Sequence, residues 1–202
     1  ITSYIDPVPA IFLGSSEVSV KEMVGAFSIY ANKGVYNAPM MVTKIEDKYG
    51  NVLANFYPES REVITENTAF LMANLLQGVV DEGTGRRLRF RYGFKNQIGG
   101  KTGTTQNHSD GWFIGITPDL AGGVWVGAED RSIHFQNLAN GQGASMALPI
   151  WALFMQKVYA DKSLAVPQSD FQKPNGVNHV LDCGDADREG MTDYDSSDEI
   201  FD

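Results

Sequence analysis

The chain has 202 residues, of which 43% are apolar and 20% are charged, and its formal net charge at pH 7 is −9. This length and composition are typical of one globular domain with its own hydrophobic core. The negative charge argues against a nucleic-acid partner, because binding to phosphates needs a basic surface. No apolar run approaches the roughly eighteen residues that indicate a membrane span.

The first predicted element is a helix that begins near Ser19, after an irregular lead-in that contains two prolines. Ser19 and Glu22 have the S-x-x-E spacing of a capping box. Apolar residues then recur at helical intervals as far as Ala31. Gly34 follows and is a typical helix stop.

Residues 40–56 predict a β-hairpin, because turn-forming residues at 47–51 separate two strand-like runs. Thr65 is a typical cap for a second helix over residues 66–80. That helix is apolar on most sides, so we expect it to be buried. The segment DEGTGRRLRF, which begins at Asp81, is expected to form a loop whose arginines lie on a solvated face.

The next part of the chain predicts three short strands, at residues 98–105, 111–117 and 122–128. The sequence T-P-D-L is a turn between the last two. We expect Lys101–Thr105 to pair antiparallel with Trp112–Ile116, and Val124–Val126 to lie next in the sheet.

Gly141 and Gly143 are expected in a loop before a last helix over residues 146–159. Pro149 would lie either in the first turn of this helix or at a kink within it. The order of elements suits an α+β fold, an antiparallel sheet with helices packed on it, over residues 1–160.

Residues 161–202 lose the periodicity of helices and strands and gain acidic residues, so we expect a poorly ordered tail. The lone Cys183 lies there and is expected to be an incidental exposed thiol. Asp185, Asp187 and the aspartates within residues 193–198 lack the spacing of a calcium-binding loop, so we expect a solvated tail and no metal.

Lys101 lies in the run GGKTGTT, where it could bind a phosphate, serve an acyl transfer or lie on a solvated strand. Gly100, Lys101 and Thr102 match the end of the P-loop pattern G-x-x-x-x-G-K-[ST]. However, Lys95 occupies the position of the first glycine of that pattern, and no apolar strand ending in Asp supplies a Mg²⁺ ligand. A nucleotide site is therefore disfavoured.

Lys-Thr-Gly followed by Thr is also the third motif of the penicillin-recognising serine transferases and hydrolases. In such a site the lysine ammonium favours a substrate carboxylate, and the threonine hydroxyl can donate to the same carboxylate. The glycine lets a peptide or a β-lactam lie against the strand backbone. The N–H of the next residue can point at the developing oxyanion, where a donor is worth about 2.7–4 kcal/mol in other acyl-transfer sites.

The residues that follow the triplet make this motif more specific, because GKTGTTQNHSDGWFIGITPDLAGGVWVG predicts a defined hairpin. The chain resembles the transpeptidase domain of class A penicillin-binding proteins, the bifunctional peptidoglycan synthases. Residues 8–34 and the segment VVDEGTGRR extend the resemblance, which covers residues 5–160. It implies the fold of the serine β-lactamases and penicillin-binding transpeptidases, and no cofactor.

The resemblance implies roles for Lys101, Thr102, Gly103 and Thr104, which match the third motif directly. All four would bind substrate, and Lys101 and Thr104 would also serve catalysis, Thr104 through its backbone N–H. The family's other two motifs, S-x-x-K and S-x-N, do not occur in this sequence; Ser19 and Lys21 are one residue too close. The nucleophile helix and the N-terminal strands of the fold are therefore expected to be absent from this chain.

We interpret the chain as the C-terminal part of a D,D-transpeptidase, and a descendant that lost its chemistry is the alternative explanation. The implied partners are peptidoglycan stem peptides ending in D-Ala-D-Ala and β-lactam inhibitors. A glycosyltransferase domain and a membrane anchor would lie upstream, and the protein would work on the outer face of the inner membrane of a bacterial envelope. A silent binding or scaffold module and a serine β-lactamase are the alternative functions.

Three other groups of residues contain types common in active sites, but a structural position explains each of them better than a catalytic or metal-binding role. His108, Ser109 and Asp110 have the residue types of a triad, but neighbours on a turn cannot converge as triad members do. His134 and His179 have no metal-ligand spacing. The tryptophans are expected in the core rather than at a substrate platform: Trp112, Trp125 and Trp151.

Overall fold

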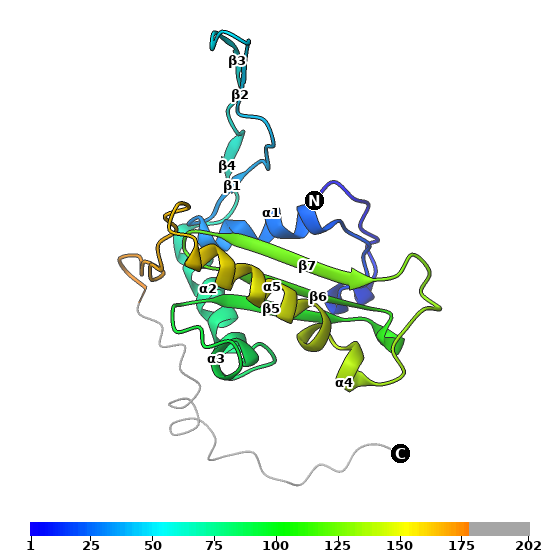
Figure 1. Ribbon diagram of the computed structural model, residues 1–202. Coiled ribbons are helices and arrows are strands. Elements are labelled where there is room, and N and C mark those ends of the chain that lie inside the picture. Colours follow the sequence, from blue (N-terminus) through cyan, green and yellow to red (C-terminus); the bar gives the residue numbers. More distant parts are fainter. Residues whose placement is uncertain (178–202) are drawn as a thin grey trace, which may run out of the picture.

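A computed structural model describes residues 1–177 and is shown in Figure 1. Its centre is an antiparallel sheet with the strand order β5-β6-β7. The strands are β5 (Gly99–Thr104), β6 (Asp110–Ile116) and β7 (Ala121–Gly127), and the main helices are α1 (Val20–Ala31), α2 (Glu66–Asp81) and α5 (Gly143–Ala160). The predicted antiparallel sheet with helices packed on it is confirmed.

The helices lie on both faces of the sheet. α1 and α2 share one face, since a Cβ built at Gly123 would meet Val24 of α1 and one at Gly99 would meet Leu76 of α2. α5 covers the other face, where a Cβ at Gly115 would meet Trp151. The register also agrees with the prediction, because Lys101 lies opposite Ile114 in the β5–β6 pair.

A row of three glycines crosses the sheet under α5. Gly100 lies opposite Gly115, and Gly115 lies opposite Gly122. The absent side chains of Gly115 and Gly122 leave room for the indole of Trp151, which is 2% exposed and would lie 2.5 Å from a Cβ at Gly115, and Gly100 leaves room for the ring of Phe113. The ring of Phe113 packs edge-on against the same indole, with 5.4 Å between centroids. Trp151 therefore belongs to the core as expected.

The other two tryptophans are less buried. Trp112 is only partly buried, and Trp125 on β7 is 41% exposed, so the prediction of a core position is wrong for Trp125. The reason lies in the register, because Trp112 and Trp125 are opposite each other in the β6–β7 pair. Opposite residues share a face and alternate with their neighbours, so Phe113 is buried on the other face, where the partly buried Val124 packs against the same core cluster.

The start of α1 has the predicted capping box. The Ser19 hydroxyl accepts from the Glu22 N–H at 3.2 Å, and the Ser19 N–H donates to the Glu22 carboxylate at 3.0 Å. The N-terminal residues use the same carboxylate, since Thr2 N–H and Ser3 N–H each donate to it at 2.7 Å. Gly34, at φ +91°, follows the helix as the predicted stop.

The predicted hairpin is confirmed as β2 (Lys44–Glu46) and β3 (Val52–Asn55). Its turn is closed by Asp47, whose carboxylate accepts from the N–H groups of Tyr49 and Asn51. A further pair, β1 (Val35–Asn37) with β4 (Ser60–Glu62), joins the hairpin to the body. Figure 1 shows the four strands as an arm that projects from the domain. The sequence does not predict the β1–β4 pair, because strands of three residues are too short for a periodic signal.

α2 begins at the predicted cap, where the Thr65 hydroxyl accepts from the Thr68 N–H at 3.2 Å. The helix is buried on one face only, and Leu75 on the other side is 55% exposed. The prediction of a helix buried on most sides is therefore wrong. The buried residues are Ala69, Ala73, Leu76 and Val80.

The loop expected after α2 contains a short helix, α3 (Arg87–Phe90). Its arginines are not all solvated, contrary to the prediction. Arg87 donates to the carbonyl of Ala144 at 2.9 Å, and Arg89 forms an ion pair with Asp81 at 2.6 Å. These arginines hold neighbouring elements because their long side chains reach backbone and carboxylate acceptors.

Three shorter helices complete the list: η1 (Pro9–Leu13), η2 (Gln106–His108) and α4 (Leu138–Gly141). Gly141 therefore ends a short helix, and α5 begins at Gly143 rather than near Met146, which corrects the predicted loop. The earlier start places Pro149 inside α5 and not in its first turn.

The first part of the predicted tail, residues 161–177, contains no helix or strand. Phe171 in this segment packs against the cluster between α2 and the sheet, and its N–H donates to the Gln97 side chain at 2.8 Å. Cys183, His179 and the acidic residues beyond them lie outside the described residues. The division of the chain at residue 160 stays a prediction.

Glu22 makes the stability of the N-terminal region depend on pH. The Ser19 backbone N–H is the largest cause that holds the pKa of the Glu22 carboxyl far below its ordinary value of 4.5. A lowered folded-state pKa means that the carboxylate stabilises the fold above pH 4.5 and that this contribution is lost as the pH falls toward the folded-state pKa. We therefore expect Glu22→Gln to lower the melting temperature at neutral pH, and the difference from wild type to shrink at about pH 3.

Thermal unfolding followed by circular dichroism measures this difference. Glu17→Gln is the matched control, because it removes the same charge from an exposed side chain next to the cap. If the melting temperature of Glu22→Gln stayed below that of wild type by the same amount down to low pH, the role of the ionised carboxylate would be contradicted.

Candidate functional site

The site predicted around Lys101 lies on β5, at the edge of the sheet in the part of the chain that the structure describes. The Thr105 N–H donates to the Asp110 carbonyl at 3.3 Å, so these two residues form a hydrogen-bonded pair. Opposite pairs in an antiparallel ladder alternate, which makes Thr104 and Gly111 a non-hydrogen-bonded pair. The N–H and C=O of Thr104 therefore point away from β6, toward the open edge.

The same alternation places the backbone of Thr102 at the open edge. Its carbonyl accepts from the Lys101 ammonium at 2.8 Å, which agrees with an orientation away from β6. The Lys101 side chain is exposed and follows its own strand. Lys101 thus supplies a positive charge beside the backbone groups of Thr102 and Thr104 that face away from β6.

The two threonine hydroxyls of the motif are held by residues outside the strand. Thr102 Oγ1 lies 2.7 Å from Thr84 Oγ1, in the loop between α2 and α3. Thr104 Oγ1 accepts from the N–H of Gly143, the first residue of α5, at 3.0 Å. Both hydroxyls share one face because residues two apart on a strand point the same way.

Gly143 lies against the backbone of the sheet. A Cβ on Gly143 would overlap the carbonyl oxygens of Gly103 and Trp112. Only glycine lets the start of α5 approach β5 and β6 closely enough for its N–H to reach Thr104. Gly103 itself is close to Trp112, since a Cβ on Gly103 would lie 3.1 Å from the Trp112 Cβ.

The structure brings Lys101, Thr102, Gly103 and Thr104 together, as expected for consecutive residues of one strand. The neighbouring residues of the turn do not form a triad in the described region. Ser109 Oγ pairs with Thr105 Oγ1 at 3.0 Å, while the buried His108 Nδ1 has no hydrogen-bond partner.

Neither a metal centre nor a membrane helix is present in the described part of the chain. Residues 1–177 contain no group of three or more His, Cys, Asp or Glu side chains placed to hold a metal ion. Within the same residues, no helix is long and apolar enough to cross a membrane.

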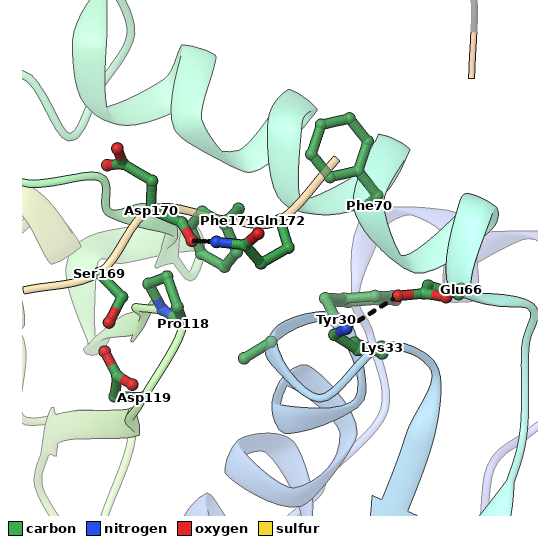
Figure 2. Close-up of a pocket in the computed structure, with 11 residues that line it drawn as sticks. Tyr30, Lys33, Glu66, Phe70, Pro118, Asp119, Ser169, Asp170, Phe171 and Gln172 are labelled. Atoms are coloured by element: carbon green, nitrogen blue, oxygen red, sulfur yellow. Dashed lines mark hydrogen bonds and ion pairs between the residues drawn. The ribbon is translucent and has the colours of Figure 1, made fainter. Parts of the chain in front are cut away.

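Figure 2 shows a pocket of about 260 Å³ that is separate from this site. Tyr30, Phe70 and Phe171 contribute aromatic walls, and Lys33 forms an ion pair with Glu66 at 3.1 Å. The pocket includes the turn that follows Ile116, which lies opposite Gly99. It is therefore at the opposite end of the sheet from Thr104.

Comparison with protein families decides the relationship that the strand and its hairpin suggest. Residues 10–143 match the family described as the penicillin-binding protein transpeptidase domain. The chain belongs to this family. It is 33% identical over 170 residues to penicillin-binding protein 1A of Aquifex aeolicus, a match that covers 84% of this chain and 22% of that protein. The predicted resemblance to class A penicillin-binding proteins is confirmed.

Solved structures of the family have the same fold. The crystal structure of penicillin-binding protein 1A from Haemophilus influenzae matches with a TM-score of 0.74 and 24% identity, over 83% of this chain and 30% of that one. The PonA1 protein of Mycobacterium tuberculosis in complex with penicillin V matches with a TM-score of 0.67 and 24% identity, over 83% of this chain and 44% of that one. This chain thus spans less than half the length of these relatives.

Sequence reasoning missed two residues of the site, Thr84 and Gly143. Thr84 lies in the segment VVDEGTGRR, which extends the family resemblance, but no pattern in the sequence connects this segment to the motif strand. The sequence predicts a loop at Gly143, and no local pattern indicates that its N–H reaches Thr104. Both contacts join residues that are distant in the sequence, 18 and 39 positions apart.

The close approach of Gly143 to the sheet leads to a prediction about stability. We expect Gly143→Ala to lower the free energy of unfolding by about 1–3 kcal/mol, because the added methyl group meets backbone that cannot rotate away. Chemical denaturation measures the change.

Gly78→Ala is the matched control, since nothing lies within 4 Å of a Cβ at this exposed position of α2. That variant should gain about 0.5–1 kcal/mol from helix propensity. Equal effects of the two substitutions would show that α5 does not approach the sheet as described.

Proposed function

We propose that this chain forms the substrate-binding wall of a D,D-transpeptidase that cross-links peptidoglycan stem peptides through a serine acyl-enzyme and binds β-lactams. The observation that carries the proposal is the free edge of the K-T-G-T strand. There Lys101 and the backbone of Thr104 lie side by side on β5, in a chain that belongs to the transpeptidase family. The relative PonA1, whose structure is described as a complex with penicillin V, supports β-lactam binding.

Each residue has a role that follows from its chemistry. The Lys101 ammonium attracts the substrate carboxylate, and the Thr102 hydroxyl donates a hydrogen bond to it. Gly103 leaves room for the peptide or the β-lactam to lie along the strand as an added strand would. The Thr104 N–H, directed to the open edge, donates to the oxyanion that forms when the carbonyl is attacked.

The nucleophile is a serine that this chain does not supply in the family's S-x-x-K form. Its Oγ attacks the carbonyl of the D-Ala-D-Ala bond, the C–N bond breaks, and D-alanine leaves with the proton. The amine of a neighbouring stem peptide then takes the acyl group from the serine.

The setting of the reaction is also part of the proposal. The full protein would act on the outer face of the inner membrane in a bacterial envelope, with an anchor and a glycosyltransferase domain upstream. No other class of function is favoured by a specific observation on the described residues.

An adduct experiment tests the proposal. Incubation with a labelled penicillin should leave the mass of the purified 202-residue chain unchanged, because it has no S-x-x-K serine. The full-length gene product should gain the mass of one penicillin, since the opened β-lactam stays attached to the serine. Intact-mass spectrometry distinguishes the two results.

A stoichiometric adduct on the short chain would mean that the nucleophile lies within it. If the full-length product gained no mass, the catalytic proposal would be wrong and a silent binding module would remain. Slow attachment followed by rapid release of the opened penicillin would instead indicate a β-lactamase.

Substitutions in the motif separate the proposed roles in the full-length protein. Gly103→Val should obstruct the wall against which the substrate lies, while Thr104→Ala keeps the backbone N–H that faces the oxyanion. We therefore expect penicillin acylation to fall at least about tenfold further for Gly103→Val than for Thr104→Ala, a difference of about 1.4 kcal/mol in activation free energy. Stopped-flow or gel-based acylation kinetics measure both rates.

The structure requires a folding control for each variant. Valine at position 103 crowds Trp112, and Thr104→Ala removes the acceptor of the Gly143 N–H. Equal losses in two variants with wild-type melting temperatures would contradict the roles assigned to Gly103 and Thr104.

A further inference from the structure

Thr84 lies outside the motif strand but contacts it directly. Its Oγ1 is 2.7 Å from the Thr102 Oγ1, which is the usual distance of an O–H···O hydrogen bond. The two residues come from different elements, since Thr84 follows α2 and Thr102 lies in β5. Thr84 is exposed, so the contact adds little to the hydrophobic core.

The loop that carries Thr84 is fixed on both sides. On one side the Gly85 N–H donates to the Val79 carbonyl at 2.9 Å, which ties the loop to the end of α2. On the other side Arg87 donates to the Ala144 carbonyl at 2.9 Å and to the Ser145 hydroxyl at 2.8 Å. The position of Thr84 relative to the strand is therefore set by the Gly85 backbone contact and the Arg87 side chain rather than by the pair of hydroxyls.

The same start of α5 also holds Thr104, through the Gly143 N–H. Arg87 thus links the loop of Thr84 to the helix end that contacts Thr104. One connected group of residues holds both threonines of the motif from the face of the sheet that α5 covers.

A hydroxyl has one hydrogen to donate and lone pairs that accept. When Thr84 donates to Thr102 Oγ1, the hydrogen of Thr102 is left for another acceptor. We propose that Thr84 is a positioning residue: its hydroxyl fixes the rotamer of Thr102 and directs the Thr102 O–H to the carboxylate of a substrate at the open edge of β5. This inference rests on the proposed function, in which Thr102 binds that carboxylate.

The test uses the full-length gene product and two acylating compounds, a penicillin and its methyl ester, which lacks the free carboxylate. Thr84→Val removes the hydroxyl and keeps the shape of the side chain. We expect it to slow acylation by the penicillin by about 3- to 10-fold, the effect of one hydrogen bond, and acylation by the ester by less than about 2-fold. Thr84→Ser should restore the wild-type ratio of the two rates.

Two further variants serve as controls. Thr43→Val makes the same change at an exposed position on the projecting arm and should leave both rates unchanged. Thr102→Val should itself reduce the preference for the penicillin over the ester, and adding Thr84→Val to it should have no further effect.

Equal slowing with both compounds would indicate general loosening of the site and would overturn the inference. An unchanged preference in Thr102→Val would instead refute the carboxylate role of Thr102, and with it both proposals. Additive losses in the double variant would show that Thr84 acts independently of Thr102.

The rotamer of Thr102 gives a readout that does not depend on activity. Three-bond couplings of its methyl group, measured by NMR, should report one rotamer in wild type and in Thr84→Ser. In Thr84→Val the couplings should take values averaged over several rotamers of Thr102. A single unchanged rotamer in Thr84→Val would overturn the inference even where the protein is acylated normally.

Discussion

The packing of Trp151 and Phe113 over a row of three glycines determines how the rest of this structure is arranged. Gly100, Gly115 and Gly122 lie opposite one another across the sheet. The Trp151 indole lies against Gly115 and Gly122, and the ring of Phe113, which packs on the same indole, lies against Gly100. Burial of a large apolar side chain stabilises a fold by about 1.5–3 kcal/mol or more, which exceeds the 0.5–1.5 kcal/mol of a typical net hydrogen bond. The distance of α5 from the sheet is therefore set by packing of the indole, and the polar contacts at the end of the helix follow from it.

Those polar contacts form the site. With α5 drawn close to the sheet, Gly143 reaches the backbone of Gly103 and Trp112, and its N–H reaches Thr104. The same helix end accepts the hydrogen bonds of Arg87. A chain of contacts thus runs from a buried indole to the hydroxyls at an open strand edge, where chemistry on a substrate would take place.

Local patterns in the sequence predicted those parts of the fold that depend on neighbouring residues. The capping box at Ser19, the cap at Thr65 and the turn between β6 and β7 each involve residues at most a few positions apart. The motif residues were found for the same reason, since all four are consecutive.

The failures of prediction concern contacts between distant segments. The exposure of Trp125 depends on which face of β7 is covered, and the single buried face of α2 depends on where the sheet lies. No motif or periodic pattern in the sequence marks Thr84 or Gly143. Their roles arise only when the loop after α2 and the start of α5 meet β5. Tertiary packing supplies this information, and residue periodicity does not contain it.

The open edge of β5 makes two opposing demands on the sequence. An edge strand with free N–H and C=O groups can pair with other chains, and proteins commonly limit this with charged side chains or irregular backbone. In the function we propose, the edge would accept an extended substrate and so would have to stay uncovered, and Lys101 would supply a charge that disfavours nonspecific pairing while it attracts a carboxylate. Glycines at 99, 100 and 103 reduce the intrinsic stability of the strand. The pairing with β6 and the packing under α5 offset this cost, so the strand can stay both ordered and accessible.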